Sequence, residues 1–63
     1  MTANWNSVEI IRKDGFPIHK FSRYDLFCLG FVEDTYFVRW CNENLFNVEH
    51  IARDGRDLVL YVS

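Results

Sequence analysis

The sequence predicts a small, mainly β protein, either an antiparallel sheet or an SH3-like, partly open barrel of about five strands. Three observations support this prediction. Short runs of β-branched and aromatic residues recur along the chain, and turn dipeptides such as Asp14-Gly15 and Asp54-Gly55 separate them. With 63 residues, of which 49% are hydrophobic and 17% aromatic, the chain has the length of one folded domain. We therefore assign residues 1–63 to a single domain.

The first predicted hairpin spans residues 8–21 and turns at Asp14-Gly15, a dipeptide that tolerates the positive φ angles of a tight loop. A two-residue loop fixes the register and gives one apolar pair and one pair of opposite charge: Ile11 with Ile18, and Glu9 with Lys20. Because Pro17 has no N–H to donate, its strand is expected at an edge of the sheet.

The second predicted hairpin spans residues 26–41, with Glu33-Asp34 at its tip. One face collects six large apolar side chains, which we assign to the core: Phe27, Leu29, Phe31, Tyr36, Val38 and Trp40. The opposite face is mixed, yet too apolar for an ordinary solvent-exposed surface. The surplus apolar area on that face is the first indication of a binding surface.

The last third of the chain leaves two alternatives open. Residues 58–62 form a continuous apolar run and are predicted as a strand. Residues 45–52 form either a strand that folds back at Asp54-Gly55, with Ile51 opposite Leu58 and Val48 opposite Tyr61, or part of a short helix at 43–53. In the helical alternative an asparagine caps the start and Gly55 follows the end.

Catalysis is not expected from this sequence. It holds no glycine-rich phosphate loop, no nucleophile elbow and no Cys-x-x-Cys pair, and 63 residues leave little room for a substrate pocket beside a core. Cys28 with His19 or His50 could form a thiol–imidazole pair, but such pairings arise readily by chance. Cys28 and Cys41 are interpreted as buried thiols, with a disulfide between them left open, and their spacing predicts neither a metal site nor a cofactor.

Nucleic-acid binding is an alternative function, because small barrels stack bases on aromatic residues that are flanked by basic ones. The candidate contacts for this alternative are Lys13, Lys20, Arg23 and Arg39. Five acidic residues balance the five basic ones among the first 40 positions, and the whole chain carries a formal charge of −2. That balance makes nucleic acid the less favoured partner.

We predict instead a small regulatory or inhibitory protein that binds a larger cellular protein. The candidate contacts lie on the mixed face of the second hairpin: Leu26, Val32, Phe37 and Arg39. A sheet edge, near Pro17 or at the C-terminal strand, offers a second route. A structural homo-oligomer is a further alternative, with a homodimer as its simplest form. The sequence has no membrane-spanning run or signal pattern, so a cytoplasmic protein is expected, of the kind that bacteria and phages encode as short reading frames.

Overall fold

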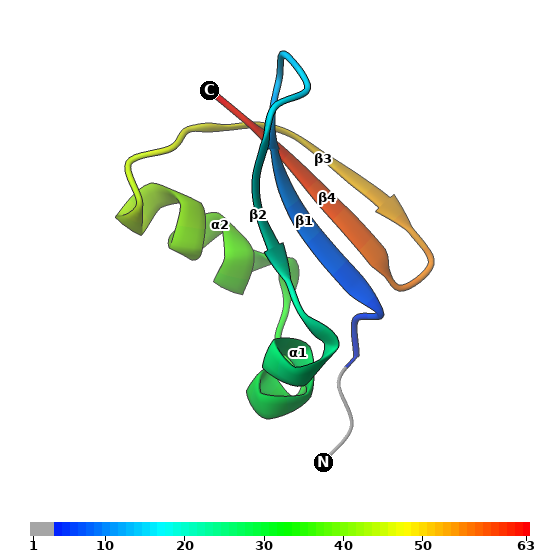
Figure 1. Ribbon diagram of the computed structural model, residues 1–63. Helices are drawn as coiled ribbons and strands as arrows, with labels where there is room; N and C mark the ends of the chain where they lie inside the picture. The colour runs from blue at the N-terminus through cyan, green and yellow to red at the C-terminus, as the bar shows by residue number, and fades with distance from the viewer. Residues whose placement is uncertain (1–3) are drawn as a thin grey trace.

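The computed structural model describes residues 4–63, which form four strands and two helices. In chain order these are β1 (Ser7–Arg12), β2 (Pro17–Phe21), α1 (Arg23–Leu29), α2 (Asp34–Glu43), β3 (Val48–Asp54) and β4 (Asp57–Val62). The strands form one sheet in the order β2-β1-β4-β3, and both helices lie on the same side of it (Figure 1). β2 and β3 are therefore the edges, and β1 and β4 occupy the centre.

The prediction of a small, sheet-rich fold is confirmed, and the finer prediction needs correction. The sheet has four strands rather than about five, and it is mixed rather than antiparallel, because β1 and β4 pair in parallel while the other two pairs are antiparallel. A parallel pair needs a long crossover connection, which β2, α1, α2 and β3 supply together. The sheet stays open at β2 and β3, so it does not form an SH3-like barrel.

The first predicted hairpin is present as β1 and β2, with a longer loop than expected. The backbone N–H of Gly15 donates to the carbonyl of Arg12 at 2.7 Å, and Gly15 has a φ of 98°, so the loop holds three residues. This places Ile11 opposite Pro17, and Ile18 becomes an extra residue in a bulge. Beyond the bulge the predicted register returns, with Glu9 opposite Lys20 and Val8 opposite Phe21, and Pro17 lies on an edge strand as predicted.

The second predicted hairpin is wrong, because residues 26–41 belong to the two helices. Ser22 caps α1: its hydroxyl accepts from the Asp25 N–H at 3.0 Å, and its own N–H donates to the Asp25 carboxylate at 3.2 Å. Gly30 ends α1 with a φ of 72°. Glu33, which was predicted at a hairpin tip, precedes the first turn of α2 as its N-cap. The aromatic residues of α1 and α2 are therefore helical despite their preference for strands.

The strand alternative holds for the last third of the chain, and the predicted helix at 43–53 is wrong, since α2 ends at Glu43 and β3 follows. The predicted register is two residues off, because Ile51 lies opposite Leu60 rather than Leu58. Gly55 takes the first position of the two-residue turn, with a φ of 62°, where glycine is the preferred residue. The turn thus lies one residue later than the sequence suggested.

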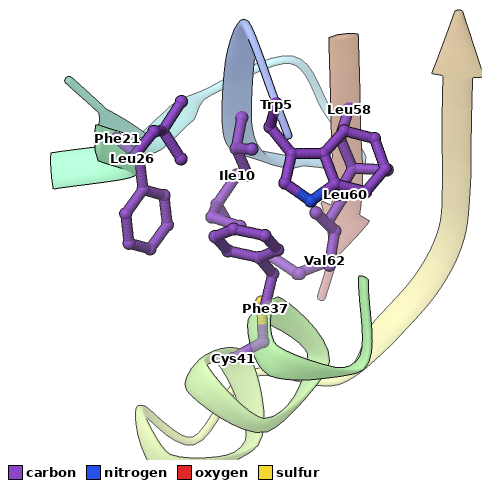
Figure 2. Close-up of a cluster of buried hydrophobic side chains, with 10 residues drawn as sticks. Trp5, Ile10, Phe21, Leu26, Phe37, Cys41, Leu58, Leu60 and Val62 are labelled. Carbon is purple, nitrogen blue, oxygen red and sulfur yellow. The ribbon is translucent and has the colours of Figure 1, made fainter. Parts of the chain in front are cut away.

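The core lies between the sheet and the helices. Its buried residues come from all six elements except β3, together with one residue that precedes β1: Trp5, Val8, Ile10, Phe21, Leu26, Phe37, Cys41, Leu58, Leu60 and Val62. Figure 2 shows Phe37 and Cys41 of α2 reaching toward the side chains of β1 and β4. Within residues 4–63, neither helix is long and apolar enough to cross a membrane.

Candidate functional site

Helix α1 exposes aromatic side chains that the core does not use. Tyr24 is 71% exposed and Phe27 is 56% exposed, and Phe31, just beyond the end of the helix, is 72% exposed. We refer to Tyr24, Phe27 and Phe31 as the α1 aromatics. Large apolar side chains exposed to this degree on neighbouring turns of a soluble domain usually mark a contact surface.

The geometry of a helix explains why α1 is apolar on two sides. Successive residues of an α-helix point about 100° apart, so residues three apart share a side. Leu26 is 2% exposed and Leu29 packs against the core, which makes their side the inner one. Tyr24 and Phe27 are also three residues apart, and they take the outer side. The sequence therefore contains one apolar pair for folding and a second that folding leaves in solvent.

A pocket of about 420 Å³ opens beside α1, between this helix, α2 and β2. Seven residues line it: His19, Phe21, Asp25, Cys28, Leu29, Tyr36 and Trp40. Its volume lies in the range of pockets that hold a small ligand or one large side chain. In α1 the lining residues are Asp25, Cys28 and Leu29, whose i, i+3, i+4 spacing places them along one side of the helix.

Aromatic packing holds the walls of this pocket. The His19 ring stacks on Trp40 with 5.0 Å between the ring centroids, and it meets Phe21 edge-on at 4.7 Å. Phe21 also meets Trp40 at 5.5 Å. On the α2 side, Tyr36 packs edge-on against the buried Phe37 at 5.2 Å. These contacts fix the rings before any ligand arrives.

The segment that contains both helices carries a net negative charge. Residues 23–43, which contain both helices, carry two arginines and four acidic side chains, whereas the rest of the chain has five basic and five acidic residues. The formal charge of residues 23–43 is therefore −2, and one of the four carboxylates, that of Asp34, is paired with Arg53 of β3. Asp25 brings one of these carboxylates to the pocket wall.

The pocket unites two residues that the sequence suggested as a thiol–imidazole pair, Cys28 and His19. Within residues 4–63 no hydrogen bond joins them, and the His19 ring is packed against Trp40 and Phe21. No cluster of three or more metal-ligating side chains occurs in this described range. Cys41, the second thiol, is buried in the core, and this burial raises its pKa. Cys28 is exposed, which corrects its interpretation as a buried thiol.

The protein-binding residues predicted from the sequence divide between core and surface. Leu26 and Phe37 are buried, so neither can contact a partner. Val32 is half-buried, and its carbonyl accepts from the Trp5 indole N–H at 2.9 Å. Of the four residues, Arg39 alone is exposed. Leu26 and Phe37 are buried because their segments are helices and not strands. In a strand, alternate residues share a face, whereas in a helix the faces repeat every 3.6 residues.

The same change exposes residues that were assigned to the core. Phe27, Phe31 and Tyr36 were predicted inside, yet all three are exposed. For Phe27 the signal that could have placed it is local: Ser22 followed three residues later by Asp25, and Gly30 after the next turn, together mark a short helix.

The four basic residues of the nucleic-acid alternative are exposed but dispersed. Lys13 lies in the loop between β1 and β2, whereas Arg23 begins α1 at the opposite end of β2 (Figure 1). Lys20 lies opposite Glu9 in the sheet, and Arg39 belongs to α2. Nucleic-acid grooves concentrate positive charge along one track, and these four residues do not form one.

The sheet edges are also less open than the sequence suggested. The C-terminal strand, β4, lies in the centre of the sheet and offers no edge. β2 is short and contains Pro17 and a bulge, and β3 has an irregularity between Val48 and His50. Bulges and prolines are the devices by which proteins discourage pairing at an edge. Strand addition is therefore the weaker route to a partner.

No protein-family model matches this sequence, and neither a curated protein nor a solved structure matches it.

Proposed function

We propose that this chain is a regulatory or inhibitory protein that binds a larger protein through the α1 aromatics and the adjoining pocket. One observation carries the proposal: three aromatic side chains, each more than half exposed, lie on or next to a helix of seven residues. Exposed aromatic residues anchor protein interfaces because they bury much area with few rotatable bonds.

The expected partner is apolar and basic. We expect the partner to have an apolar groove or patch that contacts the α1 aromatics on the outer side of the helix. Because residues 23–43 carry a net negative charge, we expect positive charge around that groove of the partner. The same negative charge repels phosphates, which favours a protein over a nucleic acid as the partner.

A pair of matched variants tests this proposal. Phe27 and Phe16 are both phenylalanines, 56% and 60% exposed, but Phe16 lies in the loop between β1 and β2, away from α1. Affinity capture from the native host lysate would use the wild-type chain, Phe27→Gln and Phe16→Gln. We expect one protein retained in stoichiometric amount by wild type and Phe16→Gln, and retained about tenfold less by Phe27→Gln.

Other results would overturn the proposal. Equal capture by both variants would place the interface elsewhere. Nucleic acid released on raising the salt concentration would support the alternative through Lys13, Lys20, Arg23 and Arg39, because phosphate contacts weaken steeply with salt. Self-association of the purified chain that Phe27→Gln abolishes, seen by sedimentation, would support the homo-oligomer instead.

A further inference from the structure

We infer that the pocket between β2, α1 and α2 receives a lysine or arginine side chain of the partner. This inference rests on the proposed function, since it names the chemistry of one partner residue at that same surface. The pocket has about 420 Å³, enough for a long side chain to enter from solvent. Its lining combines a carboxylate with aromatic rings, and the two together recognise a cation.

The carboxylate is that of Asp25. It is the one acidic side chain among the seven lining residues. Its Oδ2 accepts the Ser22 N–H at 3.2 Å, which orients the carboxylate at the start of α1. The second oxygen has no hydrogen bond within residues 4–63 and remains able to accept one from a partner's ammonium or guanidinium group.

The aromatic rings that line the pocket provide a second attraction for a cationic side chain. Tyr36 is 38% exposed and Trp40 is half-buried, and both line the pocket together with Phe21. The face of an aromatic ring carries partial negative charge, so a cation placed over it is stabilised. His19 covers one face of Trp40, and Tyr36 is the more exposed of the two rings. Leu29, which also lines the pocket, offers an apolar surface to the methylene stem of a lysine or arginine.

Other occupants fit this lining less well. A purely apolar side chain would leave the Asp25 carboxylate facing a group that cannot hydrogen-bond to it, and a phosphate would meet a like charge. A cation with an apolar stem satisfies the carboxylate and the rings together. It also agrees with the net negative charge of residues 23–43.

Small probes test the selectivity of the pocket on the intact chain. n-Butylguanidinium carries the cation and stem of an arginine, and n-pentanol is a neutral probe of similar length. The two tryptophans serve as reporters, because Trp40 lines the pocket whereas the Trp5 indole donates to Val32 in the interior. In an NMR titration, we expect n-butylguanidinium to shift the Trp40 indole N–H signal and leave that of Trp5 in place, with n-pentanol causing a much smaller shift.

Two charge-matched variants complete the test. Asp25→Asn removes the pocket carboxylate but keeps an oxygen for the Ser22 N–H. Glu33→Gln removes the same charge from an exposed side chain that makes no cap hydrogen bond and does not line the pocket. We expect Asp25→Asn to weaken n-butylguanidinium binding about fivefold and Glu33→Gln to change it by less than about twofold. Equal effects of the two variants, or equal shifts from the two probes, would overturn the inference.

This experiment also separates the inference from the proposed function. If partner capture is lost in Phe27→Gln but unchanged in Asp25→Asn, and the pocket shows no preference for the cation, then the docking surface stands and the pocket assignment fails. If the pocket selects the cation while Phe27→Gln captures the partner normally, the proposed interface fails and the pocket remains a cation site.

Discussion

β4 and α1 have almost the same length, six and seven residues, but they use their apolar side chains differently. In β4 the residues alternate, and Leu58, Leu60 and Val62 are fully buried. In α1 only Leu26 is buried to that degree, while Tyr24 and Phe27 extend into solvent. The comparison shows that the apolar residues of the strand complete the core, whereas the outer aromatic residues of the helix stay in solvent. We propose that a partner covers them.

The largest effect is expected from removing a core ring on the helical side. Phe37 is fully buried in α2 and meets Phe21 at 5.1 Å between centroids. Phe37→Ala should lower the free energy of unfolding by about 3–5 kcal/mol, because it deletes apolar contacts and leaves a cavity. Chains of this size have only about 3–9 kcal/mol of stability in total, so the midpoint of urea denaturation should move to a much lower urea concentration.

The matched control for Phe37→Ala is Phe27→Ala, which changes the same residue type on the outer side of α1. Its free energy of unfolding should stay within about 0.5 kcal/mol of wild type. If the two variants lost similar stability, the distinction between the two sides of the helical layer would be false.

The reactivity of the two cysteines tests the same difference between exposed and buried residues without any mutation. Cys28 lies exposed at the pocket, whereas Cys41 is buried against the sheet and its pKa is raised by burial, which leaves less reactive thiolate. Alkylation with iodoacetamide should modify Cys28 about a hundredfold faster than Cys41 in the native chain. Mass spectrometry of the modified peptides measures both rates, and addition of denaturant should make them similar. Equal rates in the native chain would contradict the burial of Cys41.

A smaller effect is expected from the cap that starts α1. Ser22→Ala removes the hydroxyl that accepts the Asp25 N–H, and the loss of such a cap costs about 1 kcal/mol. Because α1 carries Tyr24 and Phe27, its fraying should also weaken capture of the partner. Urea denaturation and the capture assay measure the two effects. Unchanged stability would mean that tertiary contacts, rather than the cap, hold the helix.

The hairpin of β1 and β2 could be predicted because its information is local. Glycine in the turn and the opposite charges of Glu9 and Lys20 are visible in sequence, and the structure places these two residues opposite each other. The predicted loop was one residue too short, and the bulge at Ile18 compensates for the difference. The parallel pairing of β1 with β4 joins distant segments, and nothing local in the sequence specifies it.

The helices were missed because their residues favour strands. Residues 26–41 are rich in aromatic and β-branched side chains, so an alternating pattern fitted them as well as a helical one. The error reversed inside and outside: Leu26 moved from the expected surface into the core, and Phe27 moved from the expected core to the surface. The pocket depends on contacts among β2, α1 and α2, so its lining became visible only in three dimensions.

The α1 aromatics are not needed for folding, and the free energy of unfolding of a chain that lacks all three tests this. Tyr24→Gln, Phe27→Gln and Phe31→Gln would be combined in one chain, since glutamine is polar and compatible with a helix. Urea denaturation should then give a free energy of unfolding within about 1 kcal/mol of wild type, because all three side chains are more than half exposed. A loss of about 3 kcal/mol or more would show that these rings belong to the core and would contradict the account.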